Sequence, residues 1–193
     1  MKDIIYTPVA PVRWAYLITA REQLEPNKPR AWTCDLLLSQ LDPKRAAFLE
    51  KLEQVFIDAH GSMKKRSEKG EPWKKDKEDA TLTVVKFKAL EFVRDDKSKV
   101  RGPRIIDSRK QAWDDQAIGN GSKCIIAFTV HPWNRPEGTG LTLIPSAVQV
   151  VSLVPYEGSD EKAVDGFTEQ EGGYSVAQPA GFVDEFGDEE APF

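Results

Sequence analysis

Indole rings and cationic side chains lie close together at several places in this chain of 193 residues. All the tryptophans occur before residue 157, and each has a Lys or Arg within a few residues. They are Trp14, Trp32, Trp73, Trp113 and Trp133. An exposed indole can stack on an unpaired base while cations follow the phosphates, and neither contact reads the base sequence. The alternative for each ring is burial in a core, for which Trp73 and Trp113, in polar stretches, are the least suited.

The residue types that enzymes use form no catalytic constellation in the sequence. There is no Gly-rich phosphate-binding loop ending in Gly-Lys-Ser or Gly-Lys-Thr. His60 and His131 do not pair with Cys34 or Cys124 at metal-ligand spacing, so we expect no metal and no cofactor. The doublets at 95–96 and 114–115 are both Asp-Asp and lie in hydrophilic connections. A nuclease that gathers such carboxylates around metal ions stays open as an alternative.

Charge divides the chain into two parts. Residues 157–193 hold eleven acidic side chains and the single basic Lys162, a net charge of −10, whereas residues 1–156 carry a net charge of +6. A basic body joined to an acidic tail is typical of a nucleic-acid binder that carries its own polyanion. No apolar run is long enough to span a membrane, and the N-terminus lacks the apolar stretch of a signal peptide. The two separate cysteines suit a reducing compartment.

Hydrophobic patterning predicts a mainly β body with one prominent helix. We expect strands at 12–20, 31–39, 80–93, 124–133 and 140–154, the first two joined as a hairpin and the last two joined by a loop at 134–140. Asp42 and Pro43 predict a helix start, Gly61 a stop, and Leu49, Leu52, Phe56 and Ala59 an apolar stripe. Residues 63–77 and 94–110 read as long basic loops. Such elements favour a small closed barrel, whereas residues 157–193 have the composition of a disordered tail.

Three stretches of the sequence resemble the single-stranded DNA-binding proteins of tailed bacteriophages. They are RGPRIID at 101–107, the segment from GNGSKCIIAF to SLVPY at 119–156, and the tail GFVDEFGDEEAPF at 181–193. The resemblance implies a five-stranded OB-fold body at 1–156 that binds single strands without sequence preference. It also implies an acidic tail at 157–193 that regulates binding and contacts replication proteins. The Ala191-Pro192 pair before the terminal Phe193 departs from the family's tails, many of which are acidic to the end.

From the charge pattern and this resemblance, a non-enzymatic single-stranded DNA-binding protein of phage replication and recombination is expected. The expected DNA-binding residues are Tyr16, Arg30, Trp32, Lys86, Lys88, Arg101, Arg104, Lys110, Trp113 and Trp133. Asp188, Glu189, Glu190 and Phe193 are expected to bind a protein partner. By resemblance, that partner is the phage DNA polymerase or helicase-primase, the chain is a homodimer, and it acts in the cytoplasm of the infected bacterium. An RNA-binding or strand-annealing module is the other alternative.

Overall fold

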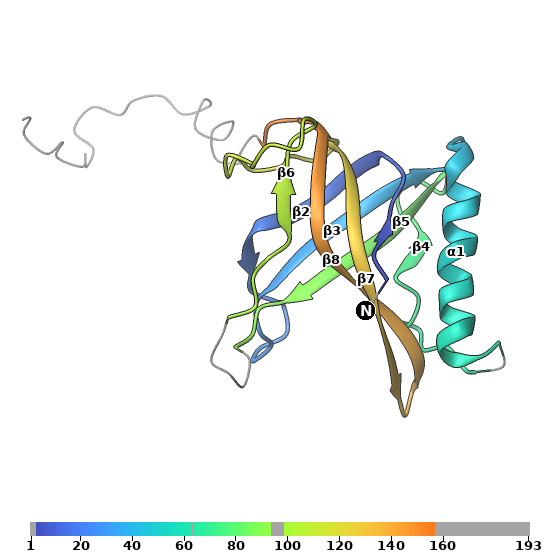
Figure 1. Ribbon diagram of the computed structural model, residues 1–193. Coiled ribbons are helices and arrows are strands. Elements are labelled where there is room, and N and C mark those ends of the chain that lie inside the picture. The colour runs from blue at the N-terminus through green and yellow to red at the C-terminus, as the bar shows by residue number, and fades with distance from the viewer. Residues whose placement is uncertain (1–2, 63, 94–98, 157–193) are drawn as a thin grey trace, which may run out of the picture. The chain divides into compact units, whose positions relative to one another are not determined.

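The computed structural model describes residues 3–62, 64–93 and 99–156 (Figure 1). The expected tail, with Asp188, Glu189, Glu190 and Phe193, lies outside the described residues. In chain order the elements are β1 (Ile5–Tyr6), β2 (Ala10–Arg21), β3 (Ala31–Ser39), α1 (Pro43–His60), β4 (Trp73–Lys75), β5 (Leu82–Leu90), β6 (Arg104–Ile106), β7 (Lys123–Arg135) and β8 (Gly138–Ser152).

Five strands form a closed ring. Antiparallel ladders join β2 to β3 and β3 to β5. A parallel contact between Phe87 and Leu143 joins β5 to β8. β8 pairs with β7 as an antiparallel hairpin, and β7 closes the ring by pairing with β2 at Cys124 and Ala10. Three short strands extend the ring: β1 beside β7, β6 beside β8, and β4 beside β5. The predicted five-stranded OB-like architecture is confirmed.

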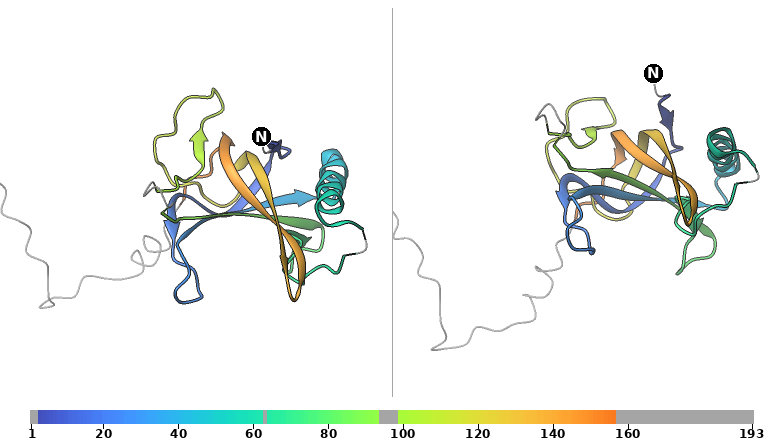
Figure 2. Two further views of the ribbon diagram at one scale, coloured as in Figure 1. Left: turned by 60° about the horizontal axis from the view of Figure 1, so that its bottom comes forward. Right: turned by 90° about the horizontal axis from the view of Figure 1, so that it is seen from below.

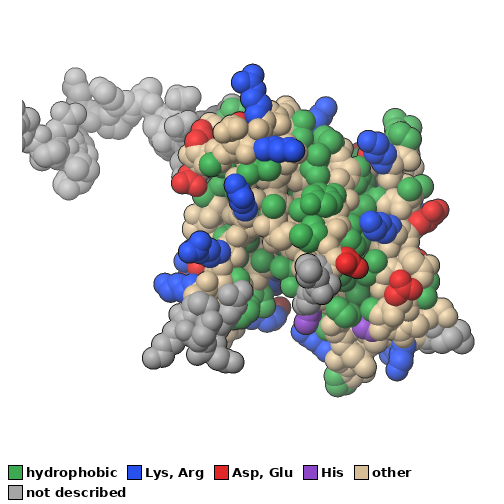
Figure 3. Space-filling view, in the orientation of Figure 1, with side chains coloured by type: hydrophobic (Ala, Val, Ile, Leu, Met, Phe, Trp, Pro, Cys, Tyr) green, Lys and Arg blue, Asp and Glu red, His purple; other side chains and the backbone are tan. Residues whose placement is uncertain are grey.

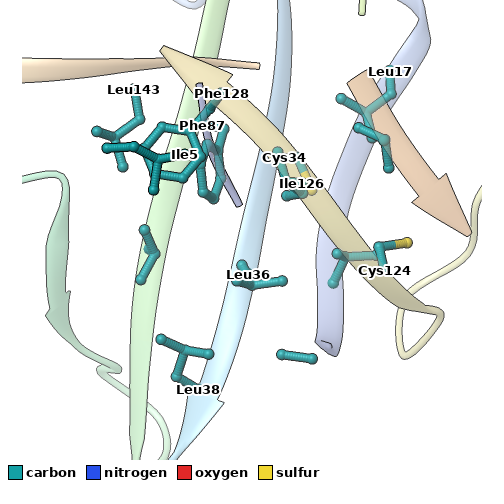
Figure 4. Packing of buried hydrophobic residues seen from close by; sticks show 14 of the residues in the cluster. Ile5, Leu17, Cys34, Leu36, Leu38, Phe87, Cys124, Ile126, Phe128 and Leu143 are labelled. Atoms are coloured by element: carbon teal, nitrogen blue, oxygen red, sulfur yellow. The ribbon is translucent and has the colours of Figure 1, made fainter. Parts of the chain in front are cut away.

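The interior of the ring is filled by alternate residues of the five strands (Figure 4). On β3, for example, Cys34, Leu36 and Leu38 are fully buried while the residues between them face outward. The Phe128 ring packs edge-on against Phe87, with centroids 5.1 Å apart, and against Phe48 of the helix at 6.2 Å. Alternation with period two thus directs one set of side chains to the core and leaves the other set for the surface.

Helix α1 begins and ends where the sequence predicts. The Asp42 carboxylate accepts a hydrogen bond from the Lys44 N–H at 2.8 Å, Pro43 is the first helical residue, and Gly61 follows the helix with φ of 80°. The fully buried residues are Phe48, Leu52 and Phe56. Leu49 is half-buried and packs against the core, so the predicted stripe was wrong only at Ala59, which is exposed. Figures 1 and 2 show α1 alongside the ring, next to β4 and the β7–β8 hairpin.

Two connections differ from the expectation. β7 ends at Arg135 and β8 begins at Gly138, so only Pro136 and Glu137 separate the two strands. The sequence had predicted a loop of seven residues here. The basic segment at 63–77 is also not a free loop, because β4 pairs with β5 and the Ser67 N–H donates to the Thr139 carbonyl at 2.9 Å. Backbone pairing with distant strands therefore holds the basic residues of this segment in place, although their local sequence shows no strand or helix periodicity.

Candidate nucleic-acid interface

The outer face of β2, β3 and β5 presents two rows of polar side chains. Strand register places Asp35 of β3 between Arg13 of β2 and Lys86 of β5. The same register makes Thr33 the partner of Tyr16 on one side and of Lys88 on the other. Directly opposite residues on one face of a sheet have Cβ atoms about 4.5–5.5 Å apart. The sheet therefore holds three cations and an aromatic ring on one rigid surface.

The β5 lysines line an open hollow of about 390 Å³ beside the ring. Its wall includes Lys86 and Lys88, the cations Lys69 and Lys74 from the 63–77 segment, and residues 141–143 of β8. Glu71 is its acidic member, and Glu71 forms an ion pair with Arg66 at 2.5 Å. The four lysines around this hollow create a positive field suited to phosphate groups.

Lys88 connects this hollow to the loop between β2 and β3. Its ammonium group donates a hydrogen bond to the Gln23 side-chain oxygen of that loop. Partial burial, together with the nearby Lys28, lowers the pKa of Lys88. The same side chain lines a second hollow of about 250 Å³, together with Arg21, Gln23 and Thr33. Lys88 thus marks the junction of the two hollows.

A third hollow, of about 650 Å³, lies at the β7–β8 hairpin and shares Lys69 with the first. Its lining includes Lys65, Trp133 and Arg135. The Arg135 guanidinium lies 5.0 Å from the centroid of the Trp133 ring. The indole approaches the backbone of Gly140 so closely that a Cβ there would be 2.2 Å from the ring, so only glycine fits.

The three hollows are linked by shared lining residues, Lys69 and Lys88, and follow one another from the hairpin to the β2–β3 loop. We call this series of hollows the cationic path and define it by Lys65, Lys69, Lys74, Lys86, Lys88 and Arg135. Arg66 lies beside it, but Glu53 and Glu71 hold its guanidinium and raise its pKa. The view in Figure 3 shows a different character over β7 and β8, where apolar side chains occupy the centre of the face.

Trp32 is placed differently from the expectation. Only 6% of this residue is exposed, and the indole packs in a small cluster with Ala20 and Ala89. Alternation along β3 explains this position, because Trp32 has the same parity as Cys34 and Leu36, which face the interior. This burial argues against the predicted stacking role, since a base needs an exposed ring face.

The other expected residues fall into two groups. Lys86, Lys88 and Trp133 line the cationic path, and Tyr16 and the exposed Arg30 lie near the end formed by the β2–β3 loop. A second group lies on β6 or shortly after it: Arg104, Lys110 and Trp113. Arg101 precedes β6 and is next to Gly102, where a Cβ would lie 2.7 Å from the Trp32 indole nitrogen. β6 pairs with β8 at Ala147–Gln149, roughly 13 Å along the strand from the part of β8 at Leu143 that lines the path. The described structure therefore does not bring all ten residues together.

Exposure of the tryptophans also differs from the expectation. Trp73 lies in β4 and Trp113 donates its indole N–H to the Gln116 carbonyl at 2.8 Å, and both rings pack partly against the main core. Trp14, which was not among the expected binding residues, is 53% exposed. Lys65, Lys69, Lys74 and Arg135 were missed as well. The signal for them was the basic composition of 63–77 and the proximity of Arg135 to Trp133 in the sequence.

Comparison with known proteins defines the class of fold. No family model matches the chain, and no curated protein matches it by sequence. Among solved structures, it is similar to gp2.5, a single-stranded DNA-binding protein encoded by bacteriophage T7, with a TM-score of 0.67 and 20% identity over 92% of this chain and 100% of that one. It is also similar to the single-stranded DNA-binding protein of bacteriophage Enc34, with a TM-score of 0.59 and 10% identity over 81% of this chain and 86% of that one.

A structure of the Enc34 protein in complex with single-stranded DNA is similar as well, with a TM-score of 0.60 and 11% identity over 80% of this chain and 89% of that one. The chain thus has the fold of phage single-stranded DNA-binding proteins, and the resemblance predicted from the sequence is confirmed at the level of the fold. Within the described residues, no helix combines the length and apolar character needed to cross a membrane.

Proposed function

We propose that this chain is a sequence-independent single-stranded DNA-binding protein and that the cationic path is its binding site. The position of the path carries the proposal. OB-fold proteins bind oligonucleotides on the face of their second and third strands, between the loop after the first strand and the loop before the last. β3 and β5 are here the second and third strands of the ring, and the path ends at the two corresponding loops.

The proposed roles follow from the chemistry of the side chains. Lys69, Lys86 and Lys88 contact phosphates from the middle of the path, and Trp133 stacks on a base at its hairpin end. Neither contact distinguishes one base from another, so binding tolerates any sequence. The ligand of the similar Enc34 structure is single-stranded DNA, which supports this choice of nucleic acid. The proposed activity is binding without catalysis.

We further infer a role for residues 157–193 from their charge. A segment of net charge −10 tethered to a body of net charge +6 competes with DNA for the cationic path. DNA that displaces the segment frees Phe193, with Asp188 to Glu190 just before it, for an apolar pocket with a basic rim on a replication protein. The phage polymerase and the helicase-primase are the proposed partners. We also propose that the protein forms a homodimer. It would act in replication and recombination, in the cytoplasm of the infected host.

A mobility-shift titration of matched single-stranded and double-stranded DNA tests the function. We expect the single strand to bind more tightly, because stacking requires unpaired bases. Tighter binding of oligo-U than of oligo-dT would favour the RNA-binding alternative. Cleavage of labelled DNA in the presence of magnesium or manganese would favour the nuclease. Equal affinity for single and double strands would contradict the proposal.

A further inference from the structure

Trp14 is held outward by an unusual backbone conformation. Its φ is 56°, in the left-handed region that a bulky residue seldom adopts. The register between β2 and β3 shifts between Arg13 and Tyr16, as at a β-bulge, and the Trp14 N–H donates to the Asn120 side chain at 2.9 Å. Bulges redirect side chains, and local strain persists where surrounding contacts enforce it. The result is an indole that is 53% exposed.

This indole forms one wall of an apolar hollow of about 390 Å³ on the far side of β2 from the β5 lysines. Two further aromatic rings, Tyr16 and Tyr156, line the same hollow, and Ile18 and Ile118 lie between them. Asn120, Asp115 and Thr19 are polar members of its lining. Asp115 also has a positive φ, of 63°, so two of the four non-glycine residues with this conformation in the described chain border one hollow.

The hollow begins where the cationic path ends. Tyr16 is the register partner of Thr33, which is the partner of Lys88 at the last junction of the path. The Arg21 guanidinium lies 4.1 Å from the centroid of the Tyr16 ring and lines the same hollow as Lys88. A single strand that passes Lys88 therefore meets a cation at Arg21 and then the aromatic rings of Tyr16 and Trp14.

We propose that the Trp14 hollow binds an unpaired base of the same strand, beyond the end of the cationic path. This inference rests on the proposed function. The rings of Trp14, Tyr16 and Tyr156 suit a planar base, and the Asp115 carboxylate opposes a phosphate but can accept a hydrogen bond from a base N–H. Arg21 holds the phosphate that connects this base to the path. The binding site is thus longer than the path alone.

The test compares wild-type protein with Trp14→Gly and Trp14→Phe in titrations with oligo-dT of about 4 to about 16 nucleotides, the range of site sizes of OB folds. Glycine removes the ring and adopts positive φ without strain, so this variant keeps the fold. We expect Trp14→Gly to bind the shortest oligonucleotides as the wild type does and the longest roughly 5- to 100-fold more weakly. Trp14→Phe retains a ring and should lose only a few-fold.

Leu41→Ala is the matched control, because Leu41 is an apolar residue that is 92% exposed and lies just before α1, outside the hollow. It should bind as the wild type at every length. If the affinity of the wild type rises with oligonucleotide length and Trp14→Gly shows the same affinities, the Trp14 site is overturned and the proposed function is left intact. A wild type that binds no single strand of any length would overturn both proposals.

Discussion

Trp133 and Trp113 are two half-buried indoles in different surroundings. Trp133 lies on the cationic path beside Arg135, whereas Trp113 lies near β6 and packs partly against the main core. Trp133→Ala should weaken single-strand binding by about 1–3 kcal/mol, the usual contribution of one stacked base. Trp113→Ala should change it much less. Anisotropy titrations of both variants test this, with thermal unfolding as the control. Equal losses in the two folded variants would place the stacking ring elsewhere.

Trp32 should behave as a core residue. Trp32→Ala removes a buried ring that packs on Ala20 and Ala89 and is expected to lower the free energy of unfolding by about 3–5 kcal/mol. Urea unfolding measures this change. The folded fraction should retain nearly full DNA affinity, since the ring does not reach the path. A stable variant with greatly weakened binding would restore Trp32 to the site.

At the scale of the strands, Asp35 is the register partner of Lys86, a residue that we propose contacts phosphate. It lies between Arg13 and Lys86 across β2, β3 and β5, and burial raises its pKa despite these cations. Asp35→Asn should tighten DNA binding roughly fivefold at neutral pH, about 1 kcal/mol for one unfavourable charge pair in water-like surroundings. Titrations at neutral pH compare the two proteins, and unchanged affinity would argue that the strand avoids this row.

The same substitution has a pH signature in stability. Because the folded-state pKa of Asp35 is raised above its unfolded value, ionising this group destabilises the fold as pH rises through the folded pKa. Asp35→Asn should therefore increase the free energy of unfolding at neutral pH, and the increase should shrink as pH falls through the raised pKa toward the ordinary Asp value. Denaturant unfolding at several pH values measures it. A constant difference across pH would contradict the assignment.

At the scale of the whole molecule, binding should depend steeply on salt. Each neutralised phosphate of a single strand contributes a slope of about −0.7 to log K against log salt. If four to six cations of the cationic path contact phosphate, the total slope should be roughly −3 to −4. Titrations between low and moderate salt measure it, and Lys86→Ala should make the slope shallower by about 0.7. A flat response would remove the electrostatic basis of the proposal.

Removal of the acidic segment tests the charge division. A chain that ends at Tyr156 lacks the segment of net charge −10 and keeps the body of net charge +6. We expect tighter single-strand binding, on the order of tenfold at low salt, because a tethered competitor has a high effective concentration. The gain should decrease as salt screens both partners. Equal affinities of the full-length and shortened proteins at low salt would show that the segment does not compete.

The strands, the helix and the charge division could be predicted from the sequence, because they depend on local patterns. Alternation predicted the five ring strands, and Asp42, Pro43 and Gly61 predicted the ends of α1, since capping and turn preferences act over a few residues. The outward lysines of β5 followed from the same alternation. The alternation along β3 also indicates that Trp32 is buried, because it falls on the same side of the strand as Cys34 and Leu36. The nearby Arg30 had suggested a surface role instead.

Which cations lie together depends on the folded arrangement of the strands. Lys69 and Lys74 reach the β5 lysines because β4 pairs with β5, and Lys65 meets Trp133 because Ser67 hydrogen-bonds to β8. Arg104 and Lys110 are equally basic in sequence but lie on β6 or shortly after it, away from the path. Trp14 is exposed because a bulge and Asn120, more than a hundred residues away, redirect it. Such placements arise from strand register and long-range hydrogen bonds, which a local sequence pattern does not encode.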